Sequence, residues 1–365
     1  MFLFYLFART EIILPPHALF RFYIHSLQNL PMRRKWPLWF AVLLIVVYLL
    51  GPHPSKPTYI RELPSVPSNP MALEQYVQSR ESAHKLKPDN EARIIWYGDS
   101  IRQKTPFAFV YLHGFSASQK EGDPVHRNIA REFGGNLYLS RLAEHGIDTS
   151  EQLLNLTADE YWTSAEEALA IGKQLGEKVI LFSTSTGGTL ALKLAATYPD
   201  DVAGLILLSP NIAINDPFAW LLNNPWGLQI ARAIKHGNYI VAEDDRLVYR
   251  QYWNKPYRLE AAVQLQELIE TTMTKETFQQ VKQPVQLIYY YKDEIHQDSV
   301  VRVSAMLTMF DELGTPASLK RKKAMPLAGN HVLASPIQSH DVPGVQNEIE
   351  KFLKDIIGLK PLRSR

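Results

Sequence analysis

The stretch of sequence that decides the fold is Val179-Ile-Leu-Phe-Ser-Thr-Ser185-Thr-Gly-Gly-Thr-Leu-Ala-Leu192. Its first half is apolar and suits a buried strand, and its second half suits a helix, so a strand runs directly into a helix. So sharp a turn requires small residues two positions before and two after its centre, because larger side chains would collide with neighbouring backbone. Ser183 and Gly187 satisfy this requirement around Ser185. The stretch therefore predicts Ser185 as a nucleophile, with Ser183 and Thr184 as weaker rivals.

This turn matches the G-x-S-x-G nucleophile elbow, with Ser183 in place of the first glycine. The helix after the serine directs its free N–H groups at the reacting centre, which favours the negative charge that develops there. A strand-to-helix loop of small residues without any chemistry is the alternative interpretation of the elbow alone.

From residue 92 onward, short apolar runs rich in β-forming residues alternate with segments of helical period. Such alternation predicts a parallel sheet with crossover helices. Several runs are apolar without alternation, as expected for strands that helices cover on both faces. The predicted strands are 93–97, 107–112, 136–139, 179–182, 204–208, 285–291 and 319–325. The predicted helices include 164–175, 189–198, 300–313 and, last, 345–357.

One long segment, 211–283, interrupts the alternation. Its pattern is helical and it is rich in aromatic residues, namely Phe218, Trp220, Trp226, Tyr239, Tyr249, Tyr252, Trp253 and Tyr257. An insertion of this length between two strands usually has a function of its own, most often as a lid. We predict that it caps the active site and lines an apolar acyl pocket. The alternative is that its aromatic side chains only pack the cap onto the core.

A second motif is Phe109-Val-Tyr-Leu-His113-Gly114-Phe115, a buried strand that ends in His-Gly. In enzymes with this elbow, the loop after such a strand supplies one backbone N–H of the oxyanion hole, and the residue after the nucleophile supplies the other. The predicted donors are therefore Phe115 and Thr186. His113 precedes the serine in the chain, and we predict a structural role for it.

A third motif, Ala328-Gly-Asn-His331, follows the last predicted strand. In elbow enzymes the nucleophile comes first in the chain, then the acid, then the histidine. His331 obeys this order, and we predict that it is the general base. His340 is a rival that lies farther beyond the strand.

Several segments together resemble the bacterial α/β-hydrolases of the carboxylesterase and monoacylglycerol-lipase-like group, over residues 92–357. These segments are Tyr111-Leu-His-Gly-Phe115, Arg141-Leu-Ala-Glu-His145-Gly146, Ser183-Thr-Ser-Thr-Gly-Gly188 and Gly329-Asn-His331. The resemblance implies an α/β-hydrolase fold with a mostly parallel central sheet flanked by helices. It also implies hydrolysis of carboxylic esters such as acyl-glycerols or similar lipid-like esters, through an acyl-enzyme and without metal or organic cofactor.

Ser183 and Glu144 depart from the pattern of this group, which has glycine at both positions, so the resemblance does not specify a substrate. A peptidase, a thioesterase or another acyl hydrolase on the same fold remains an alternative. A non-catalytic binding member of the fold is a further one.

The acid must lie in the loop between the strand 285–291 and the helix that follows it. Asp293, Glu294 and Asp298 are the candidates, and one of them must hold the imidazole of the histidine in the right tautomer. Counting forward from the strand with the spacing of the resembled group leads to Asp293. Counting backward from the helix leads to Asp298, whose neighbours Val300 and Val301 would shield its contact from water. We predict Asp298, with Asp293 as the alternative and Glu294 as a distant third.

The N-terminal region contains an almost unbroken apolar run, 36–50, directly after Arg33, Arg34 and Lys35. A basic cluster before an apolar core marks a signal peptide or an uncleaved anchor whose basic end stays in the cytoplasm. The run is shorter than the roughly 20 residues that span a bilayer comfortably. Because no small-x-small cleavage pattern follows it, we predict an uncleaved anchor over 32–51. The catalytic domain would then lie outside the cytoplasmic (inner) membrane of a bacterial cell.

The remaining segments are short. Met32 stands where an initiator would, so we predict that residues 1–31 are a non-native extension. Residues 52–91 are predicted to form a Pro- and Ser-rich tether with a helix near 73–86, and 358–365 a tail.

The composition excludes several classes of protein. The chain has 365 residues, 46% of them hydrophobic and 21% charged, with a formal net charge of +2. This balance indicates no acidic partner, and there is no basic stripe of the kind that binds nucleic acid. The absence of cysteine excludes disulfides, thiolate metal sites and a cysteine nucleophile.

Overall fold

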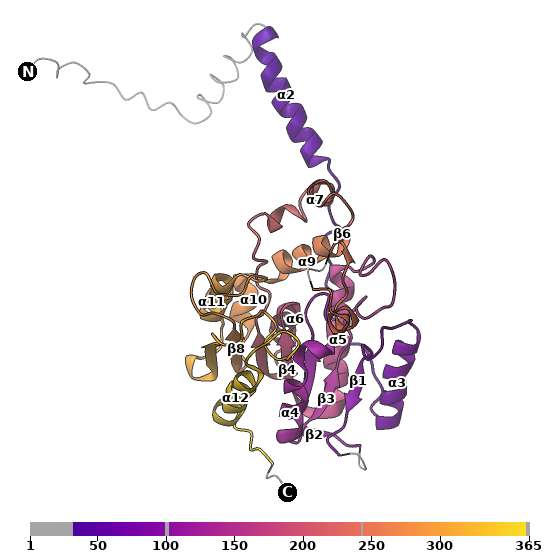
Figure 1. Cartoon of the computed structure of the whole chain (residues 1–365), viewed down its shortest axis with the longest axis vertical. Coiled ribbons are helices and arrows are strands. Elements are labelled where there is room, and N and C mark those ends of the chain that lie inside the picture. Colours follow the sequence, from indigo (N-terminus) through magenta and orange to yellow (C-terminus); the bar gives the residue numbers. More distant parts are fainter. Residues whose placement is uncertain (1–31, 99–101, 242–243, 363–365) are drawn as a thin grey trace, which may run out of the picture. The chain divides into compact units, whose positions relative to one another are not determined.

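The computed structural model describes residues 32–98, 102–241 and 244–362 (Figure 1). The chain divides into two compact units, Met1–Pro52 and His53–Arg365, and each is described by itself. The predicted non-native extension, 1–31, lies outside the described residues.

The first unit contains the helix α2 (Met32–Leu49). Its large apolar side chains are exposed, with Trp36 at 74% and Trp39 at 67% of their full accessible surface. None of the helices in the described ranges combines the length and the apolar character needed to cross a membrane. This finding does not support the predicted membrane anchor over 32–51.

The second unit is built on a seven-stranded sheet with the strand order β1-β3-β2-β4-β5-β8-β9. All neighbouring strands are parallel except β1, which pairs antiparallel with β3. Every strand predicted from the sequence is part of this sheet, so the prediction of a mostly parallel sheet is confirmed. The strands are β1 (Arg93–Ile95), β2 (Thr105–Leu112), β3 (Asn136–Leu139), β4 (Gly176–Thr184), β5 (Val202–Leu208), β8 (Val285–Tyr289) and β9 (Lys320–Ala324).

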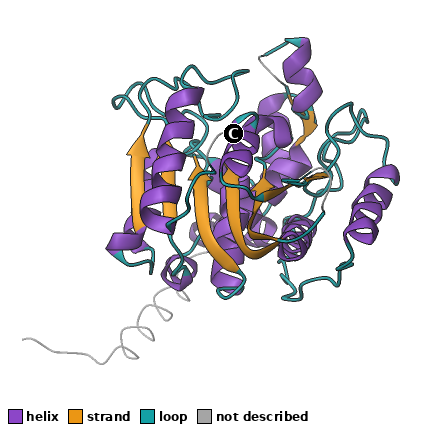
Figure 2. Cartoon of the chain, turned by 90° about the horizontal axis from the view of Figure 1, so that it is seen from below, coloured by secondary structure: helices purple, strands orange, loops and turns teal. Residues whose placement is uncertain are grey.

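Helices cover both faces of the sheet (Figure 2). Because successive strand residues point to opposite faces, Val110 of β2 belongs to one apolar cluster and the preceding Phe109 to the other. The first cluster includes α5 (Ala158–Leu175), α6 (Thr186–Thr197), α10 (Lys275–Gln280) and α11 (Val303–Glu312). The second cluster includes α4 (Val125–Glu132) and α12 (Val342–Phe352). Burial on both faces explains why the central strands read as continuous apolar runs.

The edge strand β9 has a different composition. Its residues Lys320, Arg321, Lys322 and Lys323 are charged and partly or fully exposed. Charges on an edge strand disfavour pairing with a second sheet. A short helical turn, η3 (Ala317–Leu319), precedes it, and a π-helical turn, η4 (Leu353–Ile357), follows α12.

The helix α5 begins earlier than the sequence pattern predicted, at Ala158 instead of residue 164. The Thr157 hydroxyl accepts the N–H of Glu160 at 3.1 Å, and the Glu160 carboxylate accepts the N–H of Thr157 at 3.2 Å. This capping box satisfies two N–H groups that would otherwise lack partners at the helix start. Local hydrogen bonding, which a hydrophobic period does not report, therefore sets this boundary.

The insertion between β5 and β8 is mostly helical, as predicted, but it also contains an antiparallel strand pair that the pattern did not indicate. The pair joins Tyr239 to Arg258 and Ile240 to Tyr257. The elements of the insertion are η2 (Ala219–Leu221), α7 (Gly227–Lys235), β6 (Tyr239–Ile240), α8 (Leu247–Tyr252), β7 (Tyr257–Arg258), α9 (Leu259–Thr272) and α10.

Part of the predicted Pro- and Ser-rich tether is bonded to the domain. The N–H groups of Thr58 and Tyr59 both donate to the Asp159 carboxylate, at 3.0 and 2.7 Å, and Trp162 Nε1 donates to the carbonyl of Ile60 at 2.9 Å. These bonds tie the Pro-rich segment along α5. The helix α3 (Pro70–Ser82) then buries Leu73 and Val77 against the domain.

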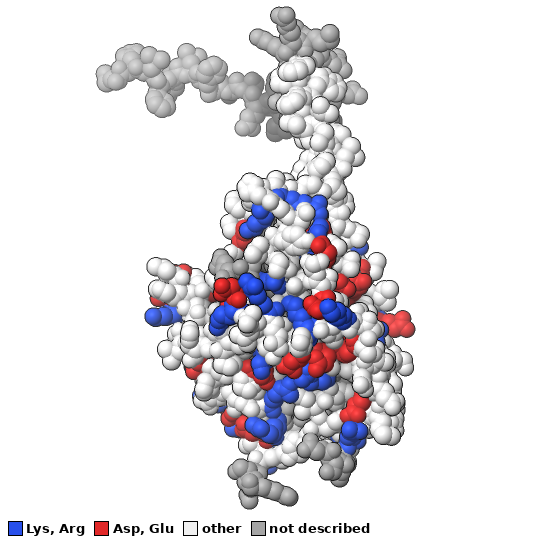
Figure 3. All heavy atoms as spheres, turned by 45° about the vertical axis from the view of Figure 1, so that its right-hand side comes forward, with Lys and Arg blue, Asp and Glu red and all other residues white. Residues whose placement is uncertain are grey.

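Positive and negative side chains are interspersed on the face of the molecule in Figure 3. Many charged side chains of the described residues are paired, as Arg258 is with Glu151 and Glu260 and Arg246 is with Asp244. Exposed pairs of this kind contribute little to stability, typically below ~1 kcal/mol each.

Candidate active site

Ser185 stands between β4 and α6 in a backbone conformation that L-residues rarely adopt, with φ 54° and ψ −120°. Such a conformation costs about 1–3 kcal/mol and persists only where surrounding bonds enforce it. The N–H of Ser185 donates to the carbonyl of Leu208 at 2.9 Å. Its carbonyl accepts from the N–H groups of Gly188 at 2.8 Å and Asn211 at 2.9 Å. The turn is thus locked by backbone on both sides.

The glycine of the elbow is sterically required. A Cβ added at Gly187 would lie 2.0 Å from the carbonyl oxygen of Leu112, a contact that no real side chain can make. The turn therefore presses directly on the end of β2, which is the physical reason for the small residue predicted at this position.

The two rival nucleophiles are engaged elsewhere. The Ser183 hydroxyl donates to the carbonyl of Ile206 at 3.2 Å, and the Thr184 hydroxyl bonds to the hydroxyl of Tyr111 at 3.0 Å. Both side chains are fully buried, whereas Ser185 retains 6% of its accessible surface. The geometry favours Ser185 among the three.

His331 and Asp298 form a buried pair. Nδ1 of His331 lies 2.6 Å from Oδ2 of Asp298, and Oδ1 of Asp298 accepts the N–H groups of Val300 at 2.9 Å and Val301 at 3.0 Å. The aspartate is 1% exposed and the histidine 9%. The carboxylate is therefore oriented by its own loop before it meets the ring.

The pair perturbs the pKa of both partners in the directions that a general base requires. Burial alone would raise the pKa of Asp298, but the His331 charge and three hydrogen bonds outweigh burial and hold it below its ordinary value. Burial would lower the pKa of His331, but the charge and hydrogen bond of Asp298 raise it above its ordinary value. A carboxylate that stays ionised stabilises the imidazolium that forms when the ring accepts a proton.

The alternative acids have other partners. Asp293 accepts from the ring and the N–H of His296, at 2.9 and 2.8 Å, and both side chains are about half exposed. Glu294 accepts the hydroxyl of Tyr291 at 2.9 Å. The structure thus brings only Asp298, of the three carboxylates considered, to His331.

Within the described residues, no hydrogen bond joins the hydroxyl of Ser185 to Nε2 of His331. In enzymes without bound substrate, catalytic hydrogen bonds are often long and tighten only when substrate binds. Gly114 nevertheless lies close to Ser185 and to Glu121. A Cβ there would lie 2.9 Å from the Cβ of Ser185 and 3.0 Å from the carboxylate of Glu121, whose charge acts on His331.

The loop after β2 is held by its histidine. His113 is fully buried, its Nδ1 donates to the carbonyl of Gly114 at 2.9 Å, and its Nε2 accepts the N–H of Leu142 at 3.0 Å. Burial lowers the pKa of His113 to about 4, so the ring is neutral at physiological pH. With both nitrogens engaged, His113 serves the structure of the loop.

The backbone N–H groups of Phe115 and Thr186, the predicted oxyanion donors, have no acceptor among the described residues. Neighbouring donors do have partners, since the N–H of Ser116 donates to Nε2 of His145 at 2.9 Å. Free donors at the loop and at the start of α6 are suited to bind a negatively charged oxygen.

Sequence reasoning missed two buried groups that bond to this loop, His145 and Glu121. His145 lies in the segment that resembled the carboxylesterase group, which was a usable signal. Glu121 lies in a run that looks like a polar loop, and no local pattern reveals its burial. Glu144 has a φ of 64°, the left-handed conformation that favours glycine, which is the residue of the resembled group at this position.

The insertion reaches the site through aromatic side chains. Tyr249 and Trp253 stack with ring centroids 4.7 Å apart, and both pack in one cluster with Ala117, Tyr252 and Val332. Val332 directly follows the general-base candidate in the chain, and Ala117 belongs to the loop after β2. The insertion therefore packs against the residue that follows His331 and against the loop after β2.

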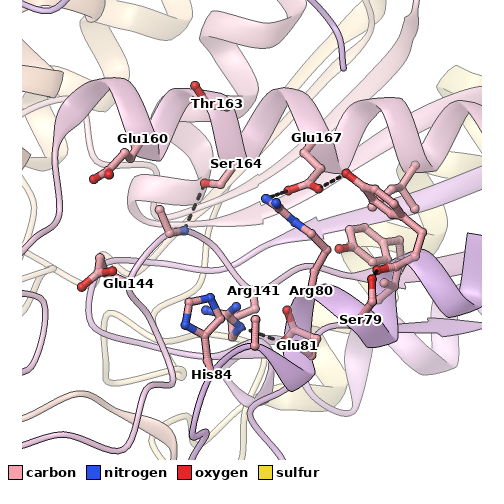
Figure 4. A pocket seen from close by; sticks show the side chains of 16 residues that line it. Ser79, Arg80, Glu81, His84, Arg141, Glu144, Glu160, Thr163, Ser164 and Glu167 are labelled. Atoms are coloured by element: carbon pink, nitrogen blue, oxygen red, sulfur yellow. Dashed lines mark hydrogen bonds and ion pairs between the residues drawn. The ribbon is translucent and has the colours of Figure 1, made fainter. Parts of the chain in front are cut away.

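A separate cavity of about 440 Å³ lies between α3, the loop after β3 and α5 (Figure 4). Its charged side chains are largely paired, Arg80 with Glu167 at 3.1 Å and Arg141 with Glu81 at 2.7 Å. None of the predicted catalytic residues lines it. In the described part of the chain, no group of three or more His, Asp or Glu residues is arranged to hold a metal ion.

Residues 158–318 match the model of a family described as serine aminopeptidase, S33. This range includes the elbow and the loop of Asp298. The chain has the α/β-hydrolase fold. The predicted superfamily and the prediction of a hydrolytic enzyme are confirmed. No curated protein matches the chain.

Solved structures share the fold of this α/β-hydrolase. A structure of the metagenome-derived lipolytic enzymes LipS and LipT has a TM-score of 0.59 at 17% identity, over 74% of this chain and 99% of that one. Est1E from Butyrivibrio proteoclasticus with bound ferulic acid has a TM-score of 0.51 at 16% identity, over 73% and 95%. A monoacylglycerol lipase from Paleococcus ferrophilus has a TM-score of 0.51 at 15% identity, over 72% and 97%. At these identities the likeness establishes the fold.

Proposed function

We propose that this α/β-hydrolase is a serine hydrolase that cleaves carboxylic esters, with Ser185 as nucleophile, His331 as general base and Asp298 as its acid. The observation that carries the proposal is the 2.6 Å pairing of Asp298 with His331 in an α/β-hydrolase whose elbow presents Ser185 at positive φ. A serine hydroxyl is a weak nucleophile until an oriented base removes its proton.

The reaction follows from these groups. His331 takes the proton of the Ser185 hydroxyl as the oxygen attacks the ester carbonyl, and the N–H groups of Phe115 and Thr186 bind the oxyanion. The imidazolium then gives the proton to the leaving alcohol, which leaves an acyl-enzyme. Water attacks this ester, giving its proton to His331, and release of the carboxylic acid restores Ser185.

The aromatic cluster beside the site supports a substrate with an apolar acyl group, such as an acyl-glycerol or a similar lipid-like ester. Tyr249 and Trp253 offer a stacked pair of rings next to Val332, and Phe115 meets Tyr257 edge to face with centroids 5.0 Å apart. Apolar side chains with a few oriented polar groups are the usual lining of such a site. Among proteins of the same fold, one is named a monoacylglycerol lipase and another was solved with ferulic acid.

Amide hydrolysis is the second candidate, because the matching family model is described as serine aminopeptidase. The same nucleophile, base and oxyanion donors serve both reactions, so the geometry of the triad does not distinguish them. The difference lies in the leaving group, an alcohol or an amine.

The test compares p-nitrophenyl esters of graded acyl length with aminoacyl p-nitroanilides, on the full chain. We expect ester turnover with a preference for medium or long acyl chains, and labelling by a fluorophosphonate probe. Turnover of the anilides without turnover of any ester would replace the ester proposal by the amide one.

Two serine variants make the test specific. Ser185→Ala should lose labelling and at least about 10⁴-fold in kcat. Ser183→Ala, which removes a neighbouring hydroxyl bonded only to the carbonyl of Ile206, should keep both. Labelling retained in Ser185→Ala and lost in Ser183→Ala would show that Ser183 is the nucleophile.

For location, we propose that the apolar run 36–50 holds the enzyme at the inner membrane of a bacterial cell, with the catalytic domain outside the cytoplasm. The exposure of side chains such as Trp36, Leu43 and Ile45 in α2 supports an apolar environment for this helix. Fractionation of the full chain, followed by carbonate washing and protease treatment of spheroplasts, tests it. Recovery in the supernatant, or complete protection from protease, would contradict it.

A further inference from the structure

A second buried carboxyl group, that of Glu121, lies beside the proposed active site outside the triad. Glu121 belongs to the short helix η1 (Gln119–Gly122) and is 2% exposed. Its Oε2 accepts the N–H of Gly114 at 2.7 Å, which is short and typical of a charge-assisted bond. Among the described residues it has no ion-pair partner within 4.0 Å. A buried acid without a salt bridge requires an explanation.

Little space separates the carboxyl group of Glu121 from the proposed nucleophile, Ser185. A Cβ added at Gly114 would lie 2.9 Å from the Cβ of Ser185 and 3.0 Å from both carboxylate oxygens of Glu121. The backbone of Gly114 thus fills the space between the carboxyl group and the serine. Any side chain at position 114 would strike one or the other, so the contact requires glycine there.

The hydrogen bonds of the loop show what this contact does. The carbonyl of Gly114 accepts from Nδ1 of His113 at 2.9 Å and from the N–H of Ala117 at 3.2 Å. Its N–H is held by Glu121. Gly114 is therefore fixed on both sides, although glycine by itself has the greatest backbone freedom. The next N–H along the chain, that of Phe115, remains unpaired among the described residues and is the proposed oxyanion donor.

We propose that Glu121 is a positioning residue of this enzyme: by holding the N–H of Gly114 it fixes the loop that presents the Phe115 N–H to the oxyanion. The inference rests on the proposed function, because it assigns a role within the same site. Glu121 acts through Gly114 and takes no part in bond making.

The charge of Glu121 has a second consequence for the same site. The titratable groups that interact electrostatically with Glu121 are His331 beyond β9, Tyr111 on β2, Tyr161 on α5 and Tyr249 on α8. Burial raises the pKa of Glu121 to about 7, against the opposing effects of the Gly114 N–H and the His331 charge. In turn, an ionised Glu121 adds to the effect of Asp298 in raising the pKa of His331. Neutralising position 121 should therefore let His331 act as a base at lower pH.

Two substitutions separate these effects. Glu121→Gln keeps an oxygen that can accept the N–H of Gly114 but removes the charge, whereas Glu121→Ala removes both. We expect Glu121→Gln to keep kcat within about threefold, with the acid limb of kcat/KM moved to lower pH. We expect Glu121→Ala to lose about tenfold to a hundredfold in kcat with little change in KM, because a misplaced oxyanion donor weakens transition-state binding.

Glu166→Gln is the matched control. Glu166 is another buried carboxyl group, 2% exposed, whose pKa burial also raises, but it bonds to Tyr198 away from the site. Its pH profile and kcat should match those of the wild type. A general effect of removing a buried acid would instead appear in both Gln variants.

The measurements distinguish failure of the proposed role of Glu121 from failure of the proposed function. The rate of fluorophosphonate labelling is measured across pH for wild type, Glu121→Gln and Glu166→Gln, besides ester turnover. No labelling of the wild type at Ser185 would overturn the proposed function itself. Labelling of the wild type, with a Glu121→Gln pH profile that coincides with it, would overturn the role of Glu121 alone. Wild-type kcat in Glu121→Ala would do the same. If Glu121→Ala does not fold, the profile of the Gln variant decides.

Discussion

Replacing Asp298 by asparagine should reduce kcat/KM for p-nitrophenyl esters by about 10⁴-fold, equivalent to ~5.5 kcal/mol of transition-state stabilisation. The substitution replaces one carboxylate oxygen by an NH₂ group of similar size, which donates a hydrogen bond instead of accepting one. In the native protein Oδ1 accepts the N–H groups of Val300 and Val301, while Oδ2 faces Nδ1 of His331 at 2.6 Å.

These contacts determine how an asparagine must sit. Its amide oxygen will take the place of Oδ1, because the N–H groups of Val300 and Val301 need an acceptor. The NH₂ group then faces Nδ1 of His331, which must give up its proton to accept from it. The ring carries its proton on Nε2 instead, and in that tautomer it cannot take the proton of Ser185.

The assay is steady-state turnover at pH 7, together with the second-order rate of fluorophosphonate labelling, which should fall in parallel. Thermal unfolding of the variant shows whether the loop remains folded. Asp293→Asn is the control, because Asp293 is about half exposed and bonded to His296, and it should retain activity within about twofold. A folded Asp298→Asn enzyme within tenfold of wild type, with Asp293→Asn inactive, would refute the assignment of the acid.

Three further predictions follow from contacts described above. Gly187→Ala forces a methyl group to within 2.0 Å of the carbonyl oxygen of Leu112 and should lower Tm by roughly 10 °C. The control is Gly237→Ala at an exposed position, where nothing lies nearer than 4.0 Å, and its Tm should be unchanged. Equal Tm values for the two variants would contradict the strain argument. Because Asp298 raises the pKa of His331 and only the neutral ring is a base, kcat/KM should rise with pH through a pKa above the ordinary histidine value of about 6.5. An acid limb below that value would show that the pair is not formed in solution. Trp253→Ala, which removes one ring of the stack, should raise KM several-fold for long acyl esters and little for acetate esters. An equal effect on both substrates would show that the ring only packs the insertion onto the core.

Much of the fold was predictable from local pattern. Several of the strands were uninterrupted apolar runs, and such runs arise where helices cover both faces of a parallel sheet. The sharp turn at Ser185 was predictable because steric crowding at a strand-to-helix turn restricts its neighbours to small residues such as Gly187, and that restriction is visible in the sequence. Boundaries were less secure: the capping box of Thr157 and Glu160 started α5 before its hydrophobic period began.

Contacts between distant parts of the chain could not be predicted in this way. Counting along the acid loop led to Asp293 from one side and Asp298 from the other, and only the tertiary structure brings one carboxylate, that of Asp298, to Nδ1 of His331. Glu121 looked like a solvated residue of a polar run, yet folding buries it against Gly114. Side-chain chemistry and local period are written in the sequence, whereas burial and electrostatic coupling depend on which segments meet in space, and those are the quantities that decide what an ionisable group does.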